Sequence, residues 1–223
     1  MRTDVSCPLI IFDLDNTLVH SRIDFLGIRQ AIIARLIQAG ALESPPADPR
    51  MRAIPEWLEF AAAFDPALAA ELWDVVASFE RDGMVHSTVE DDARQTLDAF
   101  HEAGARLAVL TNNSLTSAEA ALARWNLREP FELVLARELV PALKPNGAGV
   151  AQAHLALGDG RQTFVVGDSY IDGLAAQRAQ IGARFVAFRA NVADLSSRGV
   201  QTWATAQALA ELPALVFGAV AAS

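Results

Sequence analysis

Four large apolar residues followed by two carboxylates constrain the fold of this chain more than any other feature. The run Leu9–Phe12 has no polar alternation, which is typical of a central parallel strand covered on both faces. The run ends in Asp13 and Asp15, and ligands of open α/β sheets bind at the carboxyl ends of the strands. Two crowded carboxylates repel each other unless a cation, a proton or solvent relieves them. The run therefore predicts an α/β fold and indicates a site for metal-assisted acid–base or nucleophilic chemistry.

The composition favours a globular protein and excludes several function classes. The chain has 223 residues, enough for one α/β domain with a smaller insertion, and 52% of them are hydrophobic. Its formal net charge of −9 argues against binding to a nucleic-acid backbone, which needs clustered Lys and Arg. The single Cys7 cannot form an intramolecular disulfide, and neither a signal peptide nor a membrane-spanning run is evident. We expect a cytoplasmic monomer or homodimer without nucleic-acid or membrane partners.

Apolar periodicity predicts alternating helices and strands along most of the chain. Strands are expected at 9–12, 106–110, 131–136, 163–166 and 184–188, and helices at 25–40, 55–64, 66–80, 89–102, 116–127, 147–157, 171–180 and 202–212. Alternation of this kind implies βαβ units with right-handed crossovers. The predicted core is a Rossmann-like, parallel, five-stranded sheet flanked by helices.

One connection is far longer than the fold requires. Roughly ninety residues separate the first strand from the second, whereas a crossover needs only about a dozen. The surplus carries helical periodicity throughout. We therefore expect a small α-helical domain at residues 20–86, inserted directly after the carboxylates, and a core domain made of residues 1–19 and 87–223.

Three further segments, two strand ends and a loop, carry polar residues suited to a phosphate or a cation. Thr111 and Asn112 follow the second strand, where a hydroxyl, amides and a helix N-terminus suit an oxyanion. Lys144 precedes a helix and can neutralise a phosphate or restrain a carboxylate. Asp168 and Asp172 follow another strand, and hard cations such as Mg²⁺ prefer carboxylate oxygens. Each signal taken alone also fits helix capping, a turn or a solvated lysine.

In this order, the motifs resemble the haloacid dehalogenase-like (HAD) hydrolase superfamily over nearly the whole chain. The resemblance rests on Asp13, Asp15 and Thr17 in a DxDxT element, on Thr111, on Lys144 before a proline, and on Asp168 and Asp172 in a GDxxxD element. The helical insertion is similar to the first type of cap in that superfamily, as in phosphoglycolate phosphatase-like members. The resemblance implies a Mg²⁺-dependent phosphatase that hydrolyses a small phosphorylated metabolite, a phosphomonoester, through an aspartyl-phosphate.

The resemblance also implies a role for each motif residue. Asp13 would be the nucleophile, and Asp15 would protonate the leaving alcohol and later activate water. The implied Mg²⁺ ligands are Asp13, Asp168, the backbone carbonyl of Asp15, and Asp172 either directly or in support. The implied phosphate-binding groups are Thr111, the Asn112 backbone and Lys144, which also serves catalysis.

Asp15 separates the reaction classes of that superfamily. Its dehalogenases lack an acidic residue two positions after the nucleophile and use no metal, so Asp15 with Thr17 favours phosphoryl transfer over attack at carbon. A phosphomutase similar to β-phosphoglucomutase shares the four motifs and remains an alternative. A binding protein with this fold but without turnover is a further alternative. The motif Thr111–Asn113 differs from those of several phosphoglycolate and pyrophosphate hydrolases, so it does not identify the substrate.

Overall fold

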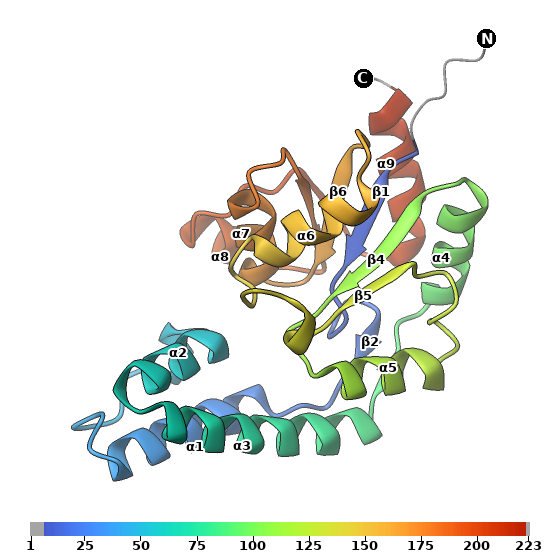
Figure 1. Cartoon of the computed structure of the whole chain (residues 1–223). Helices are drawn as coiled ribbons and strands as arrows, with labels where there is room; N and C mark the ends of the chain where they lie inside the picture. The colour runs from blue at the N-terminus through green and yellow to red at the C-terminus, as the bar shows by residue number, and fades with distance from the viewer. Residues whose placement is uncertain (1–6, 222–223) are drawn as a thin grey trace. The chain divides into compact units, whose positions relative to one another are not determined.

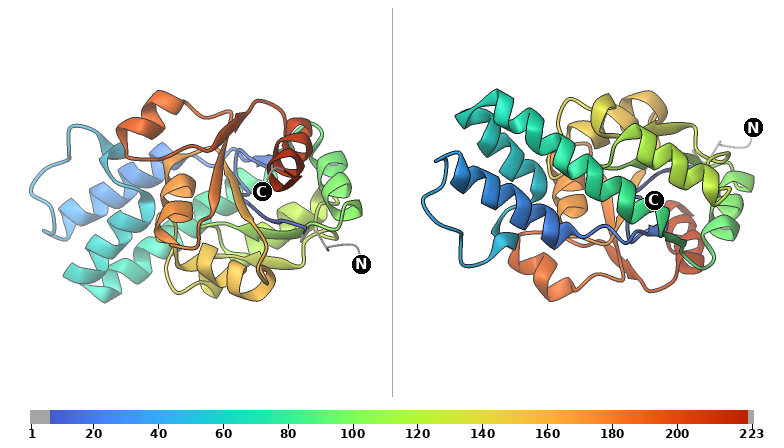
Figure 2. Two further views of the ribbon diagram at one scale, coloured as in Figure 1. Left: turned by 90° about the horizontal axis from the view of Figure 1, so that it is seen from above. Right: turned by 90° about the horizontal axis from the view of Figure 1, so that it is seen from below.

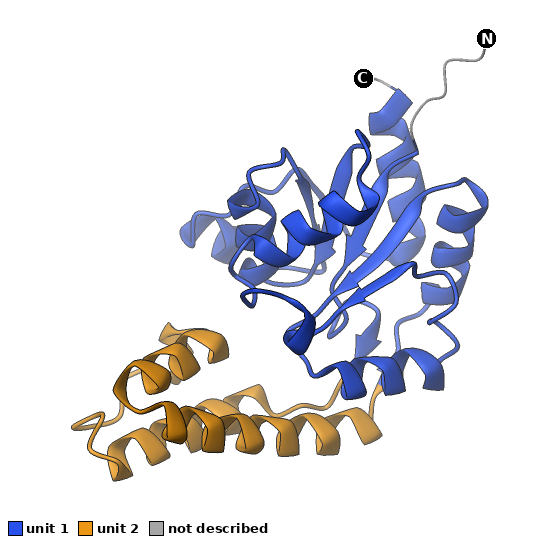
Figure 3. Cartoon of the chain, viewed as in Figure 1, with its two compact units in different colours: residues 1–20, 88–223 blue, residues 21–87 orange. Residues whose placement is uncertain are grey.

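The structure is a computed structural model that describes residues 7–221 (Figure 1). The chain divides into two compact units, Met1–His20 with Thr88–Ser223, and Ser21–Ser87 (Figure 3). The second unit occupies the part of the chain in which the sequence predicts the helical insertion. In the described part of the chain, no helix combines the length and the apolar character that crossing a membrane requires.

A parallel sheet forms the centre of the first unit. In order across the sheet, its strands are β5 (Leu133–Leu135), β4 (Arg106–Leu110), β1 (Leu9–Phe12), β6 (Thr163–Gly167), β7 (Arg184–Phe188) and β8 (Ala204–Ala206). Strand β1 lies between β4 and β6, with Ile11 opposite Ala108 and Val165. Every residue of β1 is fully buried, which explains its unbroken apolar character. The predicted parallel α/β sheet is confirmed.

Helices cover both faces of this sheet (Figures 1 and 2). They are α4 (Ala93–Glu102), α5 (Leu115–Arg124), α6 (Ala148–Leu157), α7 (Tyr170–Arg178), α8 (Val192–Ser197) and α9 (Leu212–Ala221). On one face, Leu9 and Ile11 of β1 belong to a core cluster that includes Val150 of α6 and Ala175 of α7. On the other face, Phe12 packs edge-on against Phe100 of α4, and Phe100 contacts Phe217 of α9. Successive residues of β1 thus serve opposite layers of the core.

The sheet has six strands rather than the expected five, and the helix expected at 202–212 is wrong. Strand β8 occupies three of those residues and pairs with Val186–Phe188 of β7, and a 3₁₀ turn at Leu209–Glu211 precedes α9. Three residues of alanine and threonine are too few to display a period of two, and alanine favours helices. Pairing at the edge of the sheet therefore overrode the local preference.

Two helix starts also differ from expectation. Helix α4 begins at Ala93 instead of residue 89, because β3 (Thr88–Val89) pairs antiparallel with β2 (Val19–His20). These two short strands belong to the segments that lead into and out of the second unit. Helix α5 begins at Leu115, where the Ser114 side chain accepts a hydrogen bond from the Ser117 amide, so the cap lies two residues before the expected capping box.

The second unit is a bundle of three α-helices, α1 (Phe25–Gln38), α2 (Ile54–Phe64) and α3 (Pro66–Val85), with a 3₁₀ turn at Pro49–Met51. Asp24 caps α1 by accepting from the Gly27 amide at 2.8 Å. Helix α3 continues to Val85, beyond the end expected at residue 80, and includes Gly83. A Cβ on Gly83 would lie 2.5 Å from backbone atoms of Ile23. The absence of a side chain at residue 83 therefore allows the helix to approach the Ile23 backbone this closely.

Candidate active site

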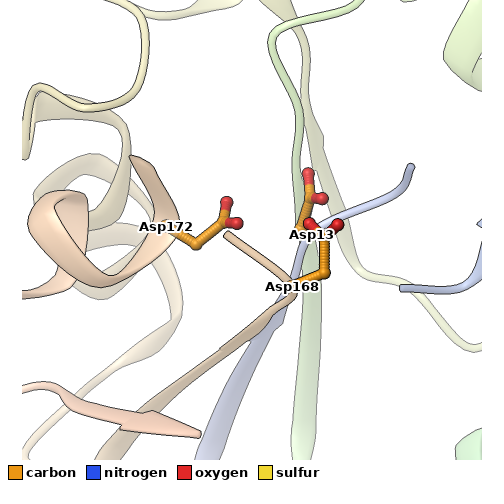
Figure 4. Close-up of side chains that lie close together, drawn as sticks. All are labelled: Asp13, Asp168 and Asp172. Atoms are coloured by element: carbon orange, nitrogen blue, oxygen red, sulfur yellow. The ribbon is translucent and has the colours of Figure 1, made fainter. Parts of the chain in front are cut away.

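The carboxyl ends of two neighbouring strands bring three carboxylates together (Figure 4). Asp13 follows β1, and its backbone amide donates to the Val166 carbonyl of β6 at 2.9 Å. Asp168 follows β6, and Asp172 lies in the first turn of α7. One carboxylate oxygen from each of the three aspartates lies within 4.8 Å of the others. The sheet thus assembles in one place residues that are more than 150 positions apart in the sequence.

Lys144 supplies the positive charge of this cluster. Its Nζ donates to Asp13 Oδ1 at 2.5 Å and to Asp172 Oδ1 at 2.7 Å, and the side chain is only 3% exposed. Lys144 is the only lysine of the chain, whereas the other 17 Lys and Arg residues are arginines. A lysine ammonium is a compact point charge, which fits between two carboxylates better than a planar guanidinium.

Asp172 is held on its other oxygen as well. Its Oδ2 accepts hydrogen bonds from the Ser169 hydroxyl at 2.8 Å and from the Ser169 amide at 3.2 Å. A Cβ on Gly167 would lie 2.5 Å from Cγ of Asp172, so the glycine of the GDxxxD element leaves the room that this side chain occupies. Both oxygens of Asp172 therefore have partners, and one of those partners is Lys144.

Two asparagines that follow β4 contact Lys144 and Asp15. The Asn112 side chain donates to the Lys144 carbonyl at 2.8 Å and accepts from the Lys144 amide at 2.9 Å, so it fixes the lysine backbone. The next residue, Asn113, donates from Nδ2 to Asp15 Oδ2. Thr111 is buried at the end of β4, and its hydroxyl accepts from the Asn113 amide at 3.1 Å. The sequence prediction considered only the backbone of Asn112 and did not identify Asn113.

Asp15 lies outside the three-carboxylate cluster. The turn that carries it is closed by hydrogen bonds from the Leu18 and Val19 amides to the Leu14 carbonyl, both at 3.0 Å. Thr17 is fully buried in the same turn, and its hydroxyl has no hydrogen-bond partner among the described residues. The side chain of Asp15 is thus directed to Asn113, whereas that of Asp13 is directed to Lys144.

The cluster has an excess of negative charge that fits a divalent cation. Burial raises the pKa of Asp13 well above its usual range, although the charge of Lys144 opposes this. Burial also raises the pKa of Asp168 to about 7, and the charge of Asp172 adds to the effect. Burial lowers the pKa of Lys144, but the charges of Asp13 and Asp172 outweigh burial and raise it overall, so Lys144 stays protonated. Buried carboxylate oxygens that one cation cannot balance are the ligands that Mg²⁺ prefers.

Comparisons with known proteins identify the family of this chain. A family model for haloacid dehalogenase-like hydrolases matches residues 7–180. A phosphoglycolate phosphatase of Caulobacter vibrioides is 33% identical over 196 residues, which are 83% of this chain and 81% of the relative. One from Cereibacter sphaeroides is 28% identical over 207 residues, or 86% of this chain and 92% of the relative. A solved HAD family hydrolase from Deinococcus radiodurans shares the fold, with a TM-score of 0.62, 23% identity, and coverage of 97% of this chain and 98% of that one. The chain belongs to the haloacid dehalogenase-like hydrolase family.

The raised pKa of Asp168 predicts how the stability of the metal-free protein depends on pH. Between the ordinary pKa of 3.8 and the folded-state value of about 7, the folded protein keeps a proton that the unfolded chain loses. The free energy of unfolding should therefore fall as pH rises through this range, by up to about 4 kcal/mol from this group. Asp168→Asn should remove the part of the fall that comes from this group, while the part from Asp13, whose pKa is also raised, remains. Urea unfolding in EDTA at several pH values tests this, and parallel curves for the two proteins would contradict it.

The burial of Lys144 can be tested chemically, because the α-amino group and Lys144 are the only amines of the chain. A protonated, 3% exposed ammonium is a poor nucleophile, so brief treatment of the folded protein with acetic anhydride should add one acetyl group. The urea-unfolded protein should take two. Intact-mass spectrometry distinguishes these products, and rapid double acetylation of the folded protein would show that Lys144 is not held as described.

Proposed function

We propose that this phosphatase of the HAD-like family hydrolyses a small phosphomonoester with Mg²⁺, through an acyl phosphate (aspartyl-phosphate) formed on Asp13. The observation that carries the proposal is the position of Lys144 between Asp13 and Asp172, beside Asp168, at the carboxyl ends of β1 and β6. An anionic phosphoryl group needs both a nucleophile and concentrated positive charge, and phosphoryl transfer is catalysed mainly by positioning and charge stabilisation.

The side chains of Asp13 and Asp168 and the backbone carbonyl of Asp15 would hold the cation. Asp172 would support it, since the oxygens of Asp172 already accept from Lys144 and Ser169. When bound, a divalent cation screens the carboxylates and neutralises charge on the phosphoryl oxygens. The raised pKa values of Asp13 and Asp168 support this assignment, because a cation restores the ionised form that a nucleophile and a ligand need.

The reaction would consist of two phosphoryl transfers, the first from the substrate to Asp13 and the second from Asp13 to water. An oxygen of Asp13 forms a bond to phosphorus while the bond from phosphorus to the leaving oxygen breaks, and Asp15 gives that oxygen a proton. In the second transfer, Asp15 takes a proton from water as the water oxygen attacks phosphorus, which releases phosphate and regenerates Asp13. The hydroxyl of Thr111, the backbone of Asn112 and the ammonium of Lys144 would bind the phosphoryl oxygens in both steps. The solved relative from Deinococcus radiodurans was crystallised with bound phosphate, which supports a phosphate ligand.

The three-helix unit Ser21–Ser87 would act as the cap domain in this proposal. In the sequence, this unit begins shortly after the turn that carries Asp13 and Asp15, and two short paired strands flank it. Lids that cover an active site exclude water during transfer and admit substrate when they open. Residues of this unit would then select the alcohol part of the substrate, while the core domain carries out the chemistry.

Phosphate release from a panel of small phosphorylated metabolites tests the proposal. The panel contains phosphoglycolate, which the names of the relatives suggest, together with phosphosugars and pyrophosphate. Wild type should release phosphate from at least one phosphomonoester with Mg²⁺ and not in EDTA, and Asp13→Asn should not. Release that is equal in wild type and Asp13→Asn would refute the proposal. An isomerised phosphosugar without free phosphate would instead identify a mutase.

A further inference from the structure

We propose that Asn113 is a positioning residue for Asp15, whose carboxyl group its side-chain amide holds during proton transfer to the leaving oxygen. The inference deepens the proposed function and rests on it, because it assumes that Asp15 carries the proton. Two observations support it, namely a hydrogen bond across the site and the way in which Asn113 itself is fixed.

Asn113 reaches Asp15 from a different strand end. The two residues are 98 positions apart, and Nδ2 of Asn113 donates to Oδ2 of Asp15. Asn113 is 5% exposed, and its backbone is tied at both polar groups. Its amide donates to the Thr111 hydroxyl at 3.1 Å, and its carbonyl accepts from the Arg137 amide at 3.0 Å. The donor is therefore held by contacts that do not involve Asp15.

In the hydrogen bond between Asn113 and Asp15, the amide nitrogen is the donor and the carboxyl oxygen is the acceptor. The NH₂ group of asparagine only donates, so it pairs with an accepting oxygen, and it binds a carboxylate more strongly than a neutral acid. When Asp15 gives its proton to the leaving oxygen it becomes a carboxylate, and the hydrogen bond from Asn113 strengthens as the proton departs. Interactions that strengthen on the way to the transition state accelerate the reaction. The same bond limits rotation of the carboxyl group of Asp15.

The adjacent residue, Asn112, provides a matched control, because its side chain contacts Lys144 and not Asp15. Its side chain fixes the backbone of Lys144, whose ammonium would act on the phosphoryl oxygens. Those oxygens are common to all substrates, whereas a proton from Asp15 is needed only when the leaving group is a poor one. Loss of the two amides should therefore produce different dependences on the leaving group.

The experiment compares kcat/KM for an alkyl phosphomonoester with kcat/KM for acetyl phosphate and p-nitrophenyl phosphate, whose leaving groups depart as stable anions. This constant covers the steps up to departure of the leaving group, so hydrolysis of the aspartyl-phosphate does not enter. Asn113→Ala should lower the alkyl value by roughly 10- to 100-fold and the other two by less than about 3-fold. Asn112→Ala should lower all three by a similar factor.

A second variant separates positioning from folding. Asn113→Asp preserves the shape of the side chain but cannot donate when ionised, so it should show the same selective loss for the alkyl ester. Circular dichroism and thermal unfolding verify that each variant is folded. Equal losses on all substrates in folded Asn113 variants would overturn the inference and leave the proposed function intact. Failure of the wild type to exceed Asp13→Asn would overturn both.

Discussion

Asparagine in place of Asp13 is expected to lower kcat for phosphate release by roughly 10⁴-fold. A carboxamide keeps the shape of the side chain but has no anionic oxygen to attack phosphorus. The same change should raise the free energy of unfolding of the metal-free protein near neutral pH. Burial raises the pKa of Asp13 despite the nearby Lys144, so the ionised form of this carboxyl destabilises the folded state as pH rises.

Phosphate release and urea unfolding of the same preparations test both parts of this prediction. A loss of activity together with a gain in stability is characteristic of a residue that is retained for chemistry at a cost in stability. Loss of stability together with loss of activity would instead make Asp13 a structural carboxylate. Full activity of a homogeneous Asp13→Asn preparation would rule out Asp13 as the nucleophile.

Methionine in place of Lys144 is expected to lower both activity and stability. Methionine has a similar length and an apolar stem, but it leaves Asp13 and Asp172 without the cation that each contacts within 2.7 Å. Removing one partner of a buried ion pair costs roughly 3–5 kcal/mol. The metal-free variant should lose stability of this order at neutral pH, and kcat/KM should fall by roughly 10²- to 10³-fold because a phosphoryl oxygen loses its cation.

Arg178→Met is the matched control for this change. Arg178 is an exposed cation near the same loop, and its Nη1 donates to the Pro145 carbonyl at 3.2 Å. Loss of an exposed charge should cost less than about 1 kcal/mol. Adding Asp172→Asn to Lys144→Met should recover part of the lost stability, since it removes one of the uncompensated carboxylates. Similar losses in Arg178→Met and Lys144→Met, or no recovery in the double variant, would contradict the described pairing.

The fold could be predicted because the core of the sheet has strong local signals. The unbroken apolar run of β1 identified a strand buried on both faces, and three predicted strand ends carried polar residues at the edge where parallel strands terminate. The sequence predicted that these ends share one edge of the sheet, and the pairing of β1 with β6 in the structure brings Asp13 close to Asp168. Strand β8 lacked such a signal, because its three residues owe their conformation to pairing with β7.

The hydrogen-bond partners within the site could not be predicted from the sequence. Asn112 and Asn113 are chemically identical neighbours, yet one fixes Lys144 and the other donates to Asp15. Their directions depend on backbone geometry after β4 and on partners that are distant in the sequence. One signal for Lys144 is present in the sequence, namely that a chain with 17 arginines contains a single lysine. That choice of cation marks a position where a compact charge is required.

Chemical trapping of the intermediate tests the central claim most directly. Wild type is mixed with its best phosphomonoester and Mg²⁺, quenched during turnover and treated with borohydride, which reduces an acyl phosphate on aspartate to homoserine. Peptide mass spectrometry should find homoserine at residue 13, and neither the Asp13→Asn variant nor wild type without substrate should contain it. Steady phosphate release without modification at Asp13, or with modification at another carboxylate, would contradict the account.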